Sequence, residues 1–134
     1  MSEQTEKKFM LIFRGTDWHK GLSAEDAQKV TEQMMTWFKS LTDQGKVIGG
    51  NPLEPEGKVI SGKNKTVSDG PFMESKEAIG GYFMLTVDSM DEAVAIGKNC
   101  PGLPHGLKVE VRQVADECPM ARQLKHEAEL AAAR

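Results

Sequence analysis

Hydrophobic residues gather in short runs that differ in their periodicity. Residues 7–14 (KKFMLIFR) are apolar at both odd and even positions, so a strand here is buried on both faces. Residues 79–88 (IGGYFMLTVD) follow the same pattern. Residues 107–115 (LKVEVRQVA) instead alternate apolar with polar residues. The pattern predicts two central strands and a third strand with charged side chains on one side.

Other segments have apolar residues at helical spacing. One helix begins after Ser23, a good N-cap, and ends before Gly45, which suits a left-handed cap. A second begins at Ser89, the first residue of a capping box, and ends before Pro101. A third begins near Pro119. Its apolar stripe is thin, so this last helix buries little on its own chain.

The segment between the first helix and the second long strand predicts short strands in hairpins. It contains the β-branched runs Val47–Ile48, Val59–Ile60 and Thr66–Val67, separated by Gly, Pro and Asn. The whole order predicts an α+β fold, a ferredoxin-like antiparallel sheet with helices on one face. We expect one domain over residues 1–117 and a C-terminal helical extension over 118–134.

The second face of the two central strands is also apolar, and no remaining segment is large enough to cover it. An exposed apolar patch of that size marks an interface. We therefore predict a C2 homodimer in which two sheets meet face to face.

Composition narrows the function classes. The chain has 134 residues, 39% hydrophobic and 28% charged, with a net charge of −3. This charge gives no general attraction to nucleic acid or anionic membrane. No apolar run is long enough to span a bilayer, and the polar N-terminus lacks a signal peptide, so we expect a cytosolic protein. Two isolated cysteines and three scattered histidines predict no metal site, and no cofactor motif is present.

Several strings together resemble a known family. SDGPFMESKEAIGGYFML at 68–85, DSMDEAVAIGKNCPGLPHG at 88–106 and KVEVRQV at 108–114 are similar to the DGPF branch of the YCII-related proteins. The resemblance implies a dimeric α/β barrel of ferredoxin-like topology. Relatives of this barrel include lactone isomerases and a dehalogenase, and some DGPF members are associated with sigma factors. YCII-type members carry a histidine in the first helix, and the corresponding residue here is Met34.

The candidate acid–base residues are therefore elsewhere. Asp69 follows a predicted short strand, where it serves either turn chemistry or a catalytic role. His105 lies in GLPHG, and an unperturbed imidazole titrates near pH ~6.5. We expect these two residues to form a catalytic pair, with a solvent-facing histidine as the alternative.

Other candidates belong to the binding site. Glu110 and Arg112 share the open side of the last strand, where they form either a carboxylate-binding pair or an ion pair across the dimer. Phe72, Glu77 and Tyr82 lie in or beside the resembling motif and are predicted to contact the substrate.

Three functions remain open from the sequence. The first is a protein that binds or transforms a small, carboxylate-bearing molecule in the dimeric barrel, with isomerase- or lyase-like acid–base chemistry by resemblance only. The second is a non-catalytic interaction module connected with sigma-factor-dependent transcription. The third is a structural homodimer without a ligand.

Overall fold

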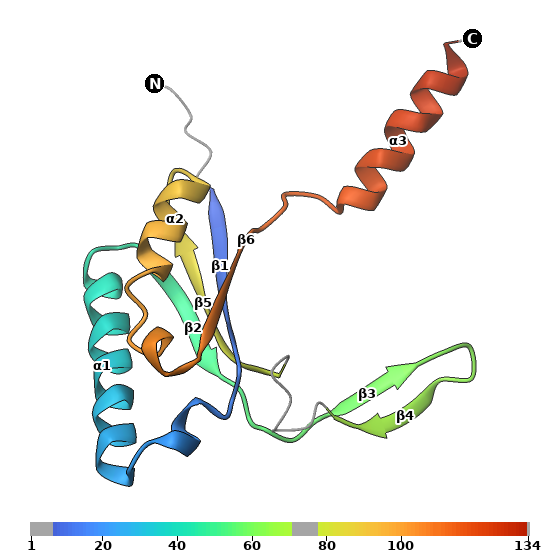
Figure 1. Ribbon diagram of the computed structural model, residues 1–134. Helices are drawn as coiled ribbons and strands as arrows, with labels where there is room; N and C mark the ends of the chain where they lie inside the picture. Colours follow the sequence, from blue (N-terminus) through green and yellow to red (C-terminus); the bar gives the residue numbers. More distant parts are fainter. Residues whose placement is uncertain (1–6, 71–77, 134) are drawn as a thin grey trace.

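The structure is a computed structural model, and it describes residues 7–70 and 78–133. Strands, α-helices and two short 3₁₀ helices (η) follow one another along the chain (Figure 1). In order they are β1 (Lys8–Arg14), η1 (Trp18–Gly21), α1 (Ala24–Asp43), β2 (Val47–Pro52), β3 (Lys58–Ser61), β4 (Thr66–Asp69), β5 (Ile79–Thr86), α2 (Met90–Gly97), η2 (Leu103–His105), β6 (Lys108–Gln113) and α3 (Pro119–Ala132).

Four strands form an antiparallel sheet in the order β2-β5-β1-β6. The two segments that are apolar on both faces, β1 and β5, occupy the centre, as their pattern predicts. Both α1 and α2 lie on one side of the sheet (Figure 1). This arrangement confirms the ferredoxin-like α+β fold.

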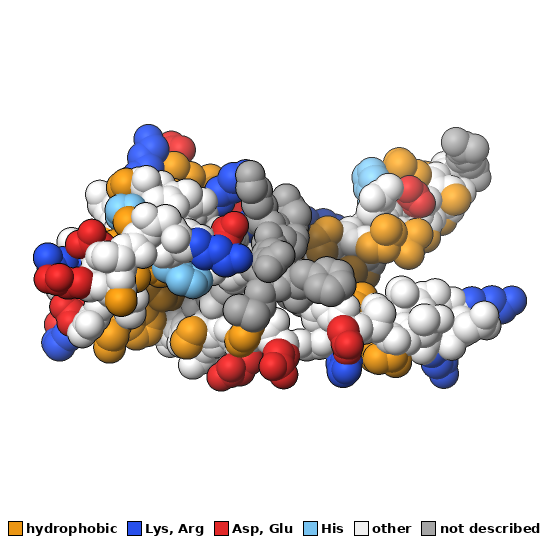
Figure 2. Space-filling view, turned by 60° about the horizontal axis from the view of Figure 1, so that its bottom comes forward, with side chains coloured by type: hydrophobic (Ala, Val, Ile, Leu, Met, Phe, Trp, Pro, Cys, Tyr) orange, Lys and Arg blue, Asp and Glu red, His pale blue; other side chains and the backbone are white. Residues whose placement is uncertain are grey.

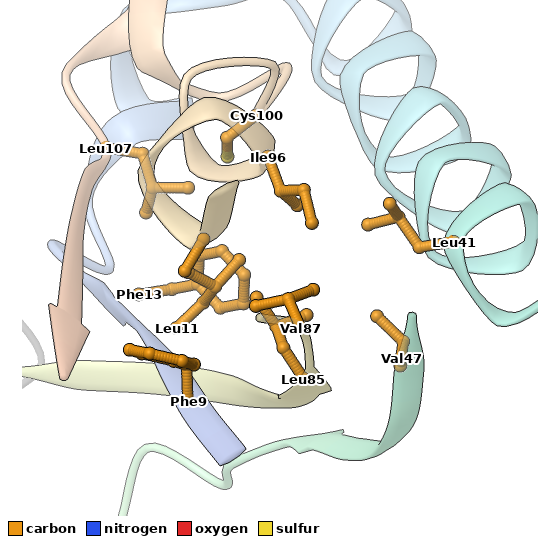
Figure 3. Close-up of a cluster of buried hydrophobic side chains, with 11 residues drawn as sticks. Phe9, Leu11, Phe13, Leu41, Val47, Leu85, Val87, Ile96, Cys100 and Leu107 are labelled. Atoms are coloured by element: carbon orange, nitrogen blue, oxygen red, sulfur yellow. The ribbon is translucent and has the colours of Figure 1, made fainter. Parts of the chain in front are cut away.

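The core lies between this sheet and the two helices (Figure 3). The inward side chains of β1 are Phe9, Leu11 and Phe13, all buried. Buried side chains from α1, β2, β5, α2 and the segments that follow β5 and α2 pack around them: Leu41, Val47, Leu85, Val87, Ala93, Ile96, Cys100 and Leu107. The alternate residues of β1 point to the opposite face of the sheet.

The helix ends follow the predicted capping chemistry. Ser23 Oγ accepts a hydrogen bond from the Asp26 backbone N–H over 3.1 Å, and Ser89 Oγ accepts one from Glu92 over 3.1 Å. Gly45 has a φ of +75°, in the left-handed region. Gly45 thus allows the chain to leave α1 and enter β2 directly.

Two parts of the chain extend away from the body of the molecule, which consists of the four-stranded sheet, α1 and α2. Strands β3 and β4 form a separate two-stranded ribbon in which every residue is exposed, and α3 has no buried residue. Both project away from the side that carries α1 and α2 (Figure 1). Among the described residues, no helix is long and apolar enough to cross a membrane.

Candidate functional site

A large cleft opens between α1 and one end of the sheet. It lies where β1 and β2 end and β5 begins, and its volume is about 1410 Å³. Helix α1 supplies one wall through Met34, Met35 and Phe38. The segment from Gly50 to Glu56 supplies the opposite wall, and Trp18 of η1 lies at its edge. The volume is sufficient for a small organic molecule.

Aromatic rings form the floor of this cleft. Phe83 lies at the centre, and its ring centroid is 4.7 Å from that of Phe13 and 4.8 Å from that of Phe38. Trp37 joins the cluster at 5.2 Å from Phe83. These separations match the offset and edge-to-face contacts that aromatic side chains prefer. The floor is therefore apolar and held in place by several mutual contacts.

The cleft is open because the middle of α1 contacts the sheet through Trp37 and Phe38 without covering its own apolar face completely. Only Val30 and Leu41 of this helix are buried. Between them, Met34, Trp37 and Phe38 are only partly buried, although they lie on the apolar face of the helix. Met35 is 67% exposed beside them. Apolar surface that the fold could have buried is thus left facing an open cavity.

Few polar side chains line the cleft. Asn51 and Tyr82 belong to the lining, but they are strand partners whose side chains point to the opposite face of the sheet, where Asn51 Nδ2 donates a 3.5 Å hydrogen bond to the Tyr82 hydroxyl. Lys39 Nζ on α1 is 2.9 Å from the Asp43 carboxylate, so its charge is already paired. Glu54 and Glu56 bring carboxylates to the rim. The described lining could therefore orient a mostly apolar molecule through the carboxylates of Glu54 and Glu56.

The predicted catalytic residues lie outside this lining. Asp69 is at the end of β4, on the exposed ribbon, where its carboxylate pairs with Lys58 of β3. His105 ends η2, next to η1, and its backbone N–H donates to the Gly102 carbonyl over 3.0 Å. Within residues 7–70 and 78–133 no hydrogen bond or ion pair joins them. The catalytic pair stays a prediction.

Glu110 and Arg112 lie on the face of the sheet opposite the helices, as their spacing predicts. Their strand neighbours on β1 are Ile12 and Met10. Glu110 accepts a 2.6 Å hydrogen bond from Arg14 Nε, and a second oxygen is 3.6 Å from Arg112. The Arg112 side chain remains 70% exposed. This arrangement is a structural ion pair within one chain, with one guanidinium still accessible.

Three more sequence candidates have different outcomes. Tyr82 is among the residues around the cleft, but strand pairing places its side chain on the open face of the sheet, beside Ile12. Phe72 and Glu77 lie outside the described residues. No group of three or more His, Cys, Asp or Glu side chains that could hold a metal ion is present in the described part of the chain.

The two cysteine thiols are in opposite environments. Burial raises the pKa of the Cys100 thiol, which packs against the Met34 sulfur at 3.7 Å. Hydrogen bonds from the backbone N–H groups of Ala121 and Met120, at the start of α3, lower the pKa of the exposed Cys118 thiol.

Met34 and Phe38 belong to the apolar residues at helical spacing between Ser23 and Gly45, and this spacing predicts a core-facing helix but no cleft. A signal was present, because Met35 extends the apolar face of α1 beyond what a two-layer core needs. The cleft depends on how closely α1 packs on the sheet, and periodicity carries no information about that packing.

Comparison with known proteins places this fold in a family. The family model of the YCII-related domain matches residues 8–118, from β1 to the residue before α3. No curated protein matches the sequence. Among solved structures, 5-chloro-2-hydroxyhydroquinone dehydrochlorinase (TftG) from Burkholderia phenoliruptrix AC1100, in complex with 2,5-dihydroxybenzoquinone, is 14% identical. The match covers 82% of this chain and 95% of that chain, with a TM-score of 0.48. Because the family model spans the whole sheet and both of its helices, the chain belongs to the family of YCII-related domains.

Proposed function

We propose that this protein binds a small, mostly apolar molecule in the cleft between α1 and the sheet. The observation that carries the proposal is the aromatic floor around Phe83, left open beneath a helix whose apolar face is only partly buried. Apolar pockets with a few convergent polar groups are the usual form of small-molecule sites. Flat aromatic or alicyclic molecules fit such a floor best, since rings stack favourably on it.

Binding, rather than a particular reaction, is what the described lining supports. Glu54, Glu56 and Lys39 are its groups able to exchange protons. An acid–base reaction carried by Asp69 and His105 would require both residues to reach the ligand from elements that lie outside the cleft. A carboxylate on the ligand would be bound by Arg112 only if the ligand also reached the open sheet face.

We further propose that two copies join through the open sheet faces. The centre of this face is apolar, with Met10 and Ile12 of β1 beside Met84 and Tyr82 of β5. A second copy would cover these side chains and would close the two sheets into a barrel. This homodimer supplies the setting in which Glu110 and Arg112 become interior residues.

The ligand proposal can be tested by intrinsic fluorescence. The chain has two tryptophans: Trp18 lines the cleft, and Trp37 contacts its floor. Benzoate and benzyl alcohol are suitable probes, because they share a ring and differ in the carboxylate. We expect saturable quenching of the emission and a higher melting temperature with at least one probe.

A matched pair of variants assigns the effect to the cleft. Met35→Glu places a charge in the lining, whereas Met90→Glu changes an exposed methionine at the start of α2, outside the cleft. Binding should be lost in the first variant and kept in the second. Equal affinities in the two variants, or no response to either probe, would contradict the proposal and favour a homodimer without a ligand.

A further inference from the structure

Two elements of the chain lack cover from the rest of the described residues. The ribbon β3–β4 is exposed at every position, and α3 has no buried residue. An isolated two-stranded hairpin is marginally stable in water, and so is an isolated helix of this length. A contact with a surface outside the body formed by the sheet, α1 and α2 would therefore stabilise both elements.

The ribbon and α3 project on the same side of that body. Figure 1 shows them both leaving on the side opposite to α1 and α2, with α3 at one end of the sheet and the ribbon at the other. Figure 2, from a different direction, shows the same two projections with an open gap between them and hydrophobic side chains exposed on both. The open sheet face lies between their bases.

We propose that this gap is occupied by a second copy of the chain, and that α3 of each copy packs on the β3–β4 ribbon of its partner. A two-fold axis between the two projections carries the ribbon of one copy toward α3 of the other, and the same contact forms twice. The proposal rests on the homodimer proposed above and adds a contact that the facing sheets do not require.

The ribbon and α3 both expose apolar side chains that could pack against each other. Ile60 and Val67 are cross-strand partners on one face of the ribbon, and they are 69% and 59% exposed. On α3, Met120 and Leu124 are one turn apart on the same side, and they are 61% and 57% exposed. Packing these four side chains together removes apolar surface from water at both ends of the dimer.

Charge also favours this pairing over contact between two ribbons. The ribbon segment 58–69 carries three lysines and one aspartate: Lys58, Lys63, Lys65 and Asp69. The segment 115–133 carries four acidic and two basic residues: Asp116, Glu117, Glu127, Glu129, Arg122 and Lys125. The two segments therefore have net charges of opposite sign. The negative surplus comes from Asp116 and Glu117, which directly precede α3, since the charged residues within α3 balance. A ribbon that reaches the start of α3, where Met120 and Leu124 lie, gains from this difference, whereas ribbon-to-ribbon contact does not.

Disulfide trapping in the full-length protein tests the proposal. In a Cys118→Ser background, one set of copies carries Ile60→Cys and a second, differently tagged set carries Leu124→Cys. After co-expression and mild oxidation, we expect a covalent dimer that contains both tags. Each set alone should remain largely uncrosslinked. Val59→Cys with Glu129→Cys is the matched control, because these positions lie on the other face of the ribbon and the far side of the helix.

Two results would overturn the proposal. The first is a yield of mixed dimer no greater than that of the control pair. The second is a bond within one chain when Ile60→Cys and Leu124→Cys are combined in the same copy, since this means that α3 folds onto its own ribbon. A failure of this kind would return the exposed stripe of α3 to the interaction-module hypothesis.

Analytical ultracentrifugation separates this inference from the homodimer itself. Leu124→Ser should raise the dimer dissociation constant about tenfold or more, because a buried leucine is lost from each contact. Leu130→Ser, on a different side of the same helix, should change it little. A dimer that tolerates both substitutions equally contradicts the α3–ribbon contact but not the facing sheets. A wild-type monomer contradicts both.

Discussion

Cys118 and Cys100 show how strongly local structure sets the reactivity of one residue type. The backbone N–H groups of Ala121 and Met120 stabilise the Cys118 thiolate and lower its pKa. Burial disfavours the Cys100 thiolate and raises its pKa. A lower pKa means that the reactive thiolate is already populated at a pH where an ordinary thiol is still protonated.

We therefore predict that alkylation of the native protein is biphasic. The rate at Cys118 should reach half its maximum at a lower pH than in a short unstructured peptide with the same thiol. Cys100 should react only after denaturant is added. Iodoacetamide labelling followed by mass spectrometry over a pH series measures both rates. Cys118→Ser should remove the fast phase alone, and a fast phase that survives this substitution would contradict the assignment.

Glu110 gives a second prediction at the scale of one residue. Its carboxylate is 2.6 Å from Arg14, and both side chains are less than a third exposed. Glu110→Gln should lower the free energy of unfolding by about 1 kcal/mol, because a charge-assisted hydrogen bond between partly buried groups is replaced by a neutral one. Glu117→Gln is the control: its pair with Arg122 is largely exposed, and it should have almost no effect in urea denaturation.

Adjacent glycines in β2 provide a test at the scale of the element. A Cβ atom on Gly50 would lie 2.6 Å from the Tyr82 carbonyl oxygen, whereas one on Gly49 would meet nothing within 4 Å. We expect Gly50→Ala to lower the free energy of unfolding by about 1–3 kcal/mol, since β2 would have to move away from β5. Gly49→Ala should be neutral or slightly stabilising, because it restricts the unfolded chain. Thermal unfolding of both variants would distinguish them, and equal losses would contradict this account.

Most elements could be predicted from the sequence because their signals are local. The apolar periods of β1 and β5, the caps at Ser23 and Ser89, and the left-handed Gly45 each depend on neighbouring residues only. Glu110 and Arg112 were placed on the correct sheet face by alternation alone. The cleft was not predicted, since it arises from the packing of α1 on the sheet, which many distant contacts set together.

At the scale of the whole molecule, other described elements cover only one face of the sheet. The helix-covered face of the sheet contains the buried core, while the other face exposes a band in which Met84 of β5 lies directly beside Met10 of β1. The ribbon and α3, which extend beyond the sheet and its two helices, are on the side of the uncovered face (Figure 1). Association with another surface is therefore the main way in which this fold can bury further apolar side chains.

We therefore predict that a charge at the centre of the open sheet face prevents association without unfolding the chain. Met84→Glu should shift the protein from dimer toward monomer, with a dissociation constant at least about tenfold higher, because each copy would bury an unpaired carboxylate against the other. Sedimentation velocity over a concentration series measures this shift. Circular dichroism should remain unchanged, since Met84 lies outside the core cluster.

The matched control for that experiment is Met90→Glu, which adds the same charge at the start of α2, in the helix layer on the other side of the sheet. It should leave the dimer intact. If both variants dissociate, repulsion from added net charge is the cause. If neither does, the open face is not the interface. If the dimer dissociates in Met84→Glu and stays intact in Met90→Glu, the second copy lies against this sheet, between the ribbon and α3.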